Sequence, residues 1–435
     1  MKKRILICLL VLLLSLTGCM ADSNELLRLP QLPQQYMLVQ AQLDQILSDN
    51  TQLSAPVSGE NRGAIQMADL NGDNIDEVLA FCKTQKDASV VMQVYIFKLE
   101  RGKYTQFAVL EGVGDSFDLC AIARMGLEKL PVLIVGWRLG ANPVCGLTAY
   151  RMEEKNMTQM YTGEYTGLVI EDVDVDSNEE LLVLRHQADA STAGTATLLN
   201  FESGQLTPAG TAPLSATVAS PLRMSYDDIG GGKMGVVVDG SVDENRIVTD
   251  VICFLEGKLV NLTYDVLTME SSATLRPAAY LSTDIDGDNV MEIPMVSPVM
   301  GTPAGSRGPL LITNWYSYEE ERGLVRKLSG YWETNGKWFC IIPDTLLPSV
   351  TITIGESVGD YPMVVFSRYD GEAERIGASL WEICCFEGPN RLQNLEHHGL
   401  LELARTGTRV YGVRMHVQNQ EIISVGELSS LFILS

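Results

Sequence analysis

The chain has 435 residues, and 55 acidic residues against 32 lysines and arginines give it a formal net charge of −23 at pH 7. This charge argues against nucleic acid and anionic lipid headgroups as partners, and it is compatible with bound cations. The length is enough to bury a large core, and it exceeds that of a typical single small domain.

The N-terminus predicts export and a lipid anchor. Lys2, Lys3 and Arg4 form a basic segment, and the apolar run that follows is too short to span a bilayer. The next residues, "LTGC", resemble the lipobox of bacterial lipoproteins, which implies cleavage after residue 18 and lipidation of Cys19. We therefore expect a signal peptide over residues 1–18 and a cell-membrane lipoprotein that faces outside the cytoplasm. An ordinary signal peptide with an incidental cysteine is the alternative.

Seven further cysteines follow, an odd number, and none of them forms a CxxC pair. Most stand inside apolar runs, so we expect buried free thiols that pack as small hydrophobic side chains. The alternative is that two of them form one disulfide, which an extracytoplasmic compartment permits. The seven are Cys82, Cys120, Cys145, Cys253, Cys340, Cys384 and Cys385.

The segments after the anchor differ in composition. Residues 19–35 are polar and proline-containing, which is typical of a stalk, and residues 36–50 carry apolar side chains at helical spacing, which predicts a short amphipathic helix. From residue 57 the pattern becomes one of short strands and turns.

Internal repetition organises the β-rich part. An acidic loop followed by an apolar run begins at Asp69, Asp172 and Asp284, at intervals of 103 and 112 residues. These intervals are about twice a unit of roughly 50–55 residues, and degenerate copies begin at Asp118 and Arg223. Each unit continues into several short strands, as a propeller blade requires.

We therefore expect a mainly β fold, with a β-propeller-like repeat domain over residues 57–335. It has about five recognisable blades and up to seven. A β-sandwich or unrelated all-β domains are the alternatives. Residues 336–435 lack the acidic loop and predict a smaller C-terminal α+β domain, or additional blades.

The acidic loops have the oxygen ligands of a cation site. "DLNGDNIDE" places side-chain oxygens at positions 1, 3 and 5 and carboxylates at positions 8 and 9. Calcium takes six to eight oxygens at about 2.3–2.6 Å, which such a loop can supply with a carbonyl and water. An EF-hand does not fit, because strands rather than helices flank the loop. A solvated acidic turn held by Asx hydrogen bonds is the alternative.

The loops resemble those of FG-GAP/VCBS-type calcium-binding propeller repeats. The resemblance covers residues 60–335 and implies structural calcium. Val175 replaces the glycine of the pattern and makes the second loop the weakest of the three, while Asn74, Ser177 and Asn289 stand at position 6. The implied ligands are Asp69, Asn71, Asp73, Asp76 and Glu77; Asp172, Asp174, Asp176 and Glu180; and Asp284, Asp286, Asp288 and Glu292.

The predicted function is that of a membrane-anchored, extracytoplasmic binding protein for a protein or glycan ligand, without nucleic acid. A structural accessory to an envelope complex and an extracellular hydrolase are the alternatives. A hydrolase predicts a pocket that gathers carboxylates from different blades, or His397 and His398 beside a buried acid. "GESVG" at residues 355–359 is interpreted as a surface turn, because the sequence after it predicts a strand instead of a helix.

Overall fold

The computed structural model describes residues 34–48, 50–86, 89–187, 191–301, 310–335, 337–371, 376–416 and 423–434. The predicted signal peptide, Cys19 and residues 20–33 lie outside this part of the chain. No helix within it is long and apolar enough to cross a membrane.

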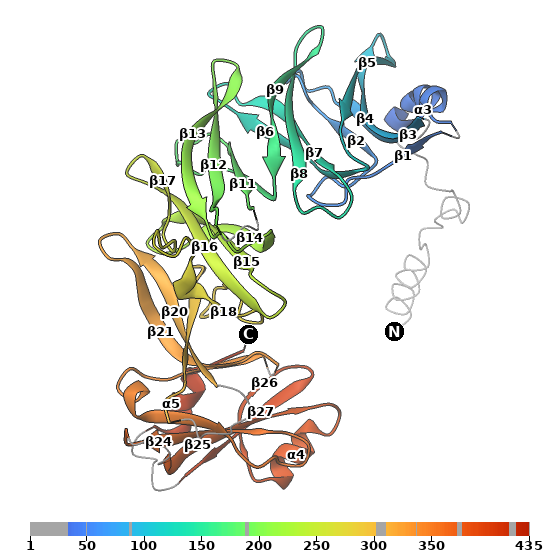
Figure 1. Ribbon diagram of the computed structural model, residues 1–435. Helices are drawn as coiled ribbons and strands as arrows, with labels where there is room; N and C mark the ends of the chain where they lie inside the picture. The colour runs from blue at the N-terminus through green and yellow to red at the C-terminus, as the bar shows by residue number, and fades with distance from the viewer. Residues whose placement is uncertain are drawn as a thin grey trace, which may run out of the picture.

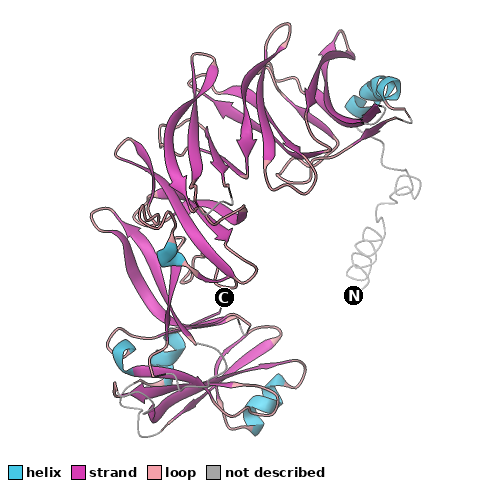
Figure 2. Cartoon of the chain, viewed as in Figure 1, coloured by secondary structure: helices cyan, strands magenta, loops and turns pink. Residues whose placement is uncertain are grey.

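Strands dominate the described residues and form six antiparallel sheets (Figure 2). The first sheet contains β1 (Thr51–Leu53), β2 (Ile65–Ala68), β3 (Glu77–Lys86), β4 (Ser89–Glu100) and β5 (Lys103–Gly112). The second contains β6 (Ser116–Met125), β7 (Leu130–Arg138), β8 (Cys145–Met152) and β9 (Met157–Tyr165). The third contains β10 (Gly167–Glu171), β11 (Glu180–Arg185), β12 (Gly194–Glu202) and β13 (Gln205–Leu214).

The other three sheets follow in chain order. The fourth contains β14 (Pro221–Asp228), β15 (Met234–Ser241), β16 (Arg246–Leu255), β17 (Lys258–Asn261) and β18 (Arg276–Pro277). The fifth contains β19 (Ile293–Pro298), β20 (Leu311–Glu319), β21 (Gly323–Glu333), β22 (Trp338–Ile341) and β28 (Phe432–Leu434). The sixth contains β23 (Val350–Ile354), β24 (Met363–Tyr369), β25 (Ile376–Glu387), β26 (Leu401–Arg405) and β27 (Arg409–Met415).

Consecutive strands pair side by side within each sheet, for example in the order β10-β11-β12-β13, as in a propeller blade. The predicted mainly β, propeller-like fold class is therefore confirmed, and five of the six sheets of the described residues have strands within residues 57–335, where about five blades are expected. The C-terminal part also carries the helices α4 (Arg391–His397) and α5 (Val425–Ser430).

The expected boundary at residue 336 falls inside the fifth sheet. Strand β21 pairs with β22 across it, and β28, from the end of the chain, pairs with β22. Residues 350–415 form the sixth sheet. Trp338 of the fifth sheet belongs to the same hydrophobic cluster as Phe366 and Trp381 of the sixth, so a common core joins the two sheets.

The sheets stack face to face, which explains the continuous apolar runs in their middle strands. Almost every residue of β7 and β11 is buried, without the alternation of a strand that has one wet face. Buried clusters join the first sheet to the second, the second to the third, and so on to the sixth.

The six sheets follow an arc, with the first and the sixth at its two ends (Figure 1). No hydrophobic cluster of the described residues joins these two sheets. A helix packs at each end instead. Helix α3 (Gln34–Ile46) places Val39 and Leu43 on the first sheet, and α4 places Leu395 on the sixth. In the fourth sheet, β14 and β15 lie toward the inside of the arc and β17 lies outside.

The cysteines behave as the sequence predicts. All seven in the described residues are free, and all except Cys385 are buried. Burial raises the pKa of Cys82, Cys253 and Cys385 to about 11, which keeps their thiols protonated and unreactive.

Candidate functional site

The three acidic loops occupy equivalent places in the first, third and fifth sheets. The first connects β2 to β3 and the second connects β10 to β11. The third precedes β19, where Thr283 and Glu292 form an antiparallel bridge. The acidic loops that repeat in the sequence therefore stand at the same place in every second sheet.

Each loop ends in a buried glutamate that turns back beneath it. Glu77, Glu180 and Glu292 are at most 2% exposed. One carboxylate oxygen of each accepts the main-chain N–H of the residue at position 2, over 2.9, 2.9 and 3.0 Å. Those residues are Leu70, Val173 and Ile285, whose apolar side chains are also buried. The alternation of acidic and apolar residues therefore folds each loop over its own glutamate.

The first aspartate of each loop accepts main-chain N–H groups. Asp69 accepts from Gly72 at 2.6 Å and from Asn74 at 2.9 Å, and Asp284 accepts from Gly287 at 2.7 Å. Asp172 accepts from Asp176 at 2.9 Å. These are the Asx hydrogen bonds of an acidic turn, and they shape the loop.

The backbone of the loops is left-handed at two positions. Asn74, Ser177 and Asn289 have φ of 63°, 74° and 65°, as expected from the residue types at position 6. At position 4, Gly72 has φ of 81°, whereas Val175 holds φ of 62°. A β-branched residue is strained in this conformation.

Burial leaves the glutamates short of compensating charge. Desolvation raises the pKa of Glu77 and of Glu180 to about 7, and the nearby aspartates add to the shift. A cation in the loop would oppose both effects. The pKa of Glu292 is also raised by burial, although Lys327 lowers it.

The second and third loops gather carboxylates closely enough to hold a metal ion. Ligand oxygens of Asp172, Asp174, Asp176 and Glu180 all lie within 4.8 Å of one another. In the third loop the same holds for Asp284, Asp286 and Glu292. The four carboxylates of the second loop therefore fit a hard cation, which prefers carboxylate oxygens.

The first loop has an amide where the second has a carboxylate. The Asn71 side-chain amide donates to Glu77 over 2.8 Å, and its oxygen accepts from the Asp73 N–H. Asp76 offers its main-chain carbonyl to the Tyr104 hydroxyl at 3.1 Å.

A lysine that the sequence reasoning missed lies inside the third loop. The Lys327 ammonium on β21 is 2.9 Å from Asp286, 2.6 Å from Asp288 and 2.8 Å from Glu292. Nothing near residues 284–292 in the sequence points to it, because strand pairing brings it there.

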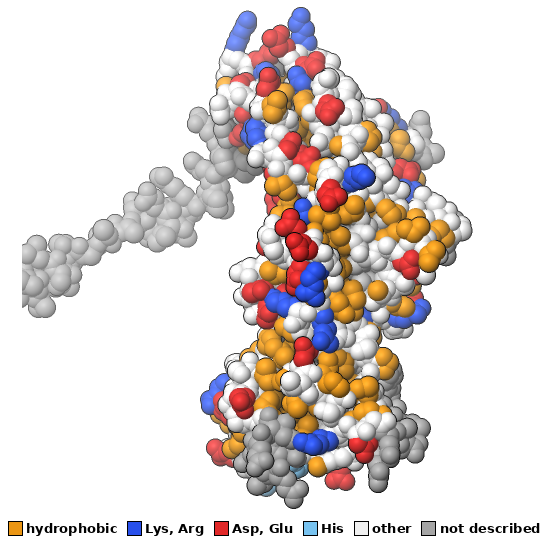
Figure 3. All heavy atoms as spheres, turned by 90° about the vertical axis from the view of Figure 1, so that its left-hand side faces the viewer, with side chains coloured by type: hydrophobic (Ala, Val, Ile, Leu, Met, Phe, Trp, Pro, Cys, Tyr) orange, Lys and Arg blue, Asp and Glu red, His pale blue; other side chains and the backbone are white. Residues whose placement is uncertain are grey.

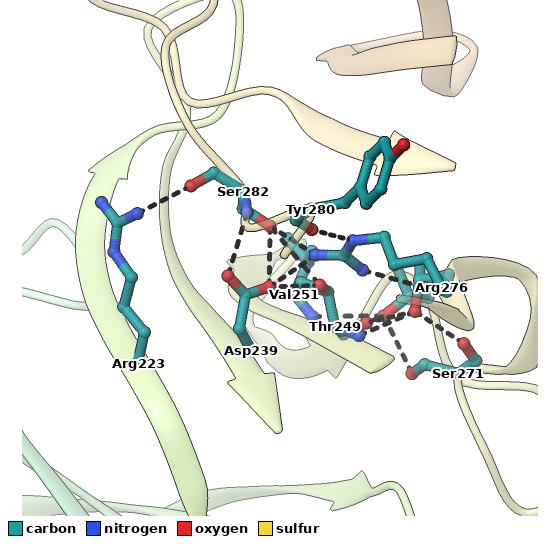
Figure 4. Close-up of polar contacts among 10 residues, drawn as sticks. Arg223, Asp239, Thr249, Val251, Ser271, Arg276, Tyr280 and Ser282 are labelled. Atoms are coloured by element: carbon teal, nitrogen blue, oxygen red, sulfur yellow. Dashed lines mark hydrogen bonds and ion pairs between the residues drawn. The ribbon is translucent and has the colours of Figure 1, made fainter. Parts of the chain in front are cut away.

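A buried ion pair within the fourth sheet holds the segment that leads into the third loop (Figure 4). Arg276 lies 2.8 Å from Asp239, and both side chains are at most 2% exposed. Asp239 also accepts from the Ser282 N–H at 3.0 Å and from the Thr249 hydroxyl at 2.5 Å. Ser282 stands two residues before Asp284, so this network sets the start of the loop.

A hollow of about 490 Å³ opens where the first strands of three successive sheets meet. Residues of β6, β10 and β14 line it, including Leu119, Ile170 and Met224. Glu60, Glu171 and Glu179 are its charged residues. Desolvation raises the pKa of Glu171, and Glu179 and Glu60 raise it further. The hollow thus brings together carboxylates from the segment before β2 and from the third sheet.

The histidines and the serine considered as hydrolase residues lie in the sixth sheet and its connections. The rings of His397 and His398, at the end of α4, lie 4.8 Å apart, and His398 stacks on Phe386. Ser357 stands in the loop between β23 and β24, just before a turn at residues 359–360, so the segment leads into a strand, as predicted.

No protein-family model matches this sequence, and no curated protein matches it. Solved structures give distant matches. A protein from Lactobacillus plantarum has 8% identity and a TM-score of 0.25, over 75% of this chain and 85% of that one. A rhamnogalacturonan lyase from Bacillus licheniformis has 14% identity and a TM-score of 0.31, over 73% of this chain and 61% of the lyase. An exo-β-1,3-galactanase from Phanerochaete chrysosporium has 9% identity and a TM-score of 0.25, over 78% and 81%. Similarity at this level does not establish a common fold or function.

Proposed function

We propose that this chain is a lipid-anchored, extracytoplasmic binding protein of a bacterial cell. Calcium in its acidic loops stiffens the blade-like sheets, and the hollow between β6, β10 and β14 binds a protein or glycan ligand. The observation that supports the calcium most directly is the convergence of four carboxylates in the second loop, at Asp172, Asp174, Asp176 and Glu180. Their resemblance to FG-GAP/VCBS repeats supports calcium over other divalent ions.

Calcium suits this loop for reasons of charge and flexibility. The four carboxylates repel one another without a cation, and calcium accepts irregular oxygen geometry more readily than magnesium does. Two backbone segments meet in the loop, the end of β10 and the start of β11. An ion that holds both would stabilise this connection.

Calorimetric titration of the full chain with calcium tests this role. We expect calcium to bind and to raise the melting temperature, and chelator to lower it. Asp172→Asn, which removes the acidic residue common to position 1 of all three loops, should remove one site, while Asp265→Asn, at an exposed Asx turn outside the three loops, should remove none. No heat of binding and an unchanged melting temperature with chelator would refute the calcium role.

The hollow supports the binding role. Most of its lining side chains are apolar and its charged groups are all acidic, whereas acidic and basic side chains are mixed on the outer face of the arc (Figure 3). A ligand with ammonium groups or many hydroxyl donors complements such a surface. The proposed ligand class is therefore a basic peptide segment or a glycan.

Screening the protein against glycan and envelope-protein arrays tests the binding role. Glu171→Gln should abolish the interaction without changing the melting temperature, whereas Glu202→Gln, on the exposed end of β12, should have no effect. Binding that survives both Glu171→Gln and Glu179→Gln would exclude the hollow.

Hydrolysis is a second candidate function, and the same three carboxylates support it. The raised pKa of Glu171 suits a general acid beside an ionised partner. Release of reducing ends from polysaccharides, lost in Glu171→Gln, would favour hydrolysis over binding alone.

The anchor is tested by metabolic labelling with a radioactive fatty acid. We expect the label to enter the wild-type chain and to be absent from Cys19→Ala, which should be released from the membrane fraction. Equal labelling of both chains would exclude Cys19 as the lipidated residue.

A further inference from the structure

We infer that Lys327 is the resident cation of the third acidic loop, so that this loop binds no calcium in the wild-type protein. The inference rests on the proposed calcium role of the other loops, because it states where that role ends. The evidence for it is the set of contacts between Lys327 and the carboxylates of the loop. Lys327 lies on β21, outside the sequence pattern that defines the loop.

The ammonium of Lys327 meets three separate carboxylates, one for each of its hydrogens. The distances are 2.9 Å to Asp286, 2.6 Å to Asp288 and 2.8 Å to Glu292. Glu292 is fully buried, and its other oxygen accepts the Ile285 N–H at 3.0 Å. All the hydrogens of the ammonium and both oxygens of the buried acid are therefore satisfied.

This arrangement excludes calcium as long as the lysine stays. The ammonium contacts three of the four residues that a calcium ion would need as ligands at about 2.3–2.6 Å. Calcium could enter only after three charge-assisted hydrogen bonds had broken and the lysine had left. The lysine also has a high effective concentration at the loop because it belongs to the same chain, whereas calcium must bind from dilute solution and lose translational entropy.

Lys327 reaches the loop because of a β-bulge. The register between β20 and β21 shifts between Trp315, which pairs with Leu328, and Tyr316, which pairs with Arg326, so Lys327 is the extra residue. The residue after Glu292 pairs with Tyr316, which places the bulge beside the loop.

The first and third sheets have the same bulge at the same register. The skipped residue is Phe107 between Gln106 and Ala108 in the first sheet, and Ala209 between Pro208 and Gly210 in the third. Neither of these residues carries a charge. The second loop, opposite Ala209, keeps its four carboxylates free of this lysine, which distinguishes it from the third loop.

The test counts calcium ions bound per full chain, by equilibrium dialysis with metal analysis. In wild-type protein, Asp284→Asn should leave the number unchanged, whereas Asp172→Asn should lower it by one. Lys327→Ala should raise the number by one, and Asp284→Asn added to it should cancel the gain. Arg326→Ala, which removes the neighbouring exposed pair with Asp344, is the matched control and should change nothing.

A reciprocal variant keeps the test decisive if Lys327→Ala does not fold. Ala209→Lys places an ammonium at the equivalent bulge and should lower the number of calcium ions by one. Loss of one ion in Asp284→Asn alone would overturn the inference. So would a folded Lys327→Ala chain that gains none. If wild-type protein binds no calcium and Lys327→Ala binds one, the proposed calcium function fails while this inference stands.

Discussion

At the scale of the residue, Val175 is where the second acidic loop carries backbone strain. Its φ of 62° is left-handed, and its side chain is 65% exposed, so no packing compensates for the strain. We predict that Val175→Gly stabilises the protein by about 1 kcal/mol, since the relieved strain exceeds the added flexibility of the unfolded chain. Chemical denaturation measures this change.

Gly72 provides the reverse experiment in the first loop. It has φ of 81°, and a Cβ added there would meet no atom within 4 Å. Gly72→Val should therefore cost about 1–2 kcal/mol through backbone strain alone. A neutral result at both positions would show that the loop backbone relaxes.

The buried pair of Asp239 and Arg276 predicts a larger effect. Replacing one partner leaves a buried charge without its counterion, so Asp239→Asn or Arg276→Met should cost about 3–5 kcal/mol in the free energy of unfolding. The double variant Asp239→Leu/Arg276→Met should cost less than the sum of the single variants. Additive costs would mean that the two charges are independently solvated.

At the scale of the element, the acidic loop is a unit whose stability depends on pH. The folded-state pKa of Glu77 and of Glu180 is about 7, above the ordinary value of 4.5. Between these values the folded chain binds more protons than the unfolded chain, so both groups make unfolding easier as the pH rises. We predict that, in chelator, Glu77→Gln/Glu180→Gln gains stability relative to wild type from pH 4.5 to pH 7.

The comparison with wild type is needed because His186 acts in the opposite direction. Burial lowers its pKa to about 4, so its contribution to stability rises with pH between about 4 and 6.5. That contribution is the same in wild type and variant, and it cancels in the difference. Saturating calcium should reverse the sign of the difference, because the ion stabilises the ionised glutamates. A difference that is flat in chelator would contradict the raised pKa values.

Much of the conformation of each acidic loop could be predicted from the sequence, because the interactions that shape it are local. Position 6 of each loop, the buried glutamate and the apolar residue at position 2 all act within nine residues of one another. The bulge that carries Lys327 could not be predicted, because it depends on the register of β20 against β21. The Arg276–Asp239 pair likewise joins residues 37 positions apart.

At the scale of the whole molecule, each sheet packs against its neighbours along the chain. We therefore expect a change that destabilises one sheet to affect mainly the adjacent sheets of the arc. The C-terminal strand β28 returns to the fifth sheet, where Phe432 stacks on Trp338 with ring centroids 5.4 Å apart. Deleting residues 423–435 should lower amide protection in β22 to β27 and leave β3 to β8 protected. Hydrogen exchange with mass spectrometry measures this. Uniform loss of protection would indicate one cooperative unit.

The sequence by itself determined the class of fold and the place of the acidic loops, because strand periodicity, turn residues and repeated spacing are written in neighbouring residues. Tertiary structure decided the arc of sheets, the return of β28 and the hollow with Glu60, Glu171 and Glu179. It also decided that the carboxylates of the third acidic loop contact a lysine, whereas those of the second loop contact none in the described part of the chain. These features depend on which strands pair and in what register, and that is set by packing between segments far apart in the chain.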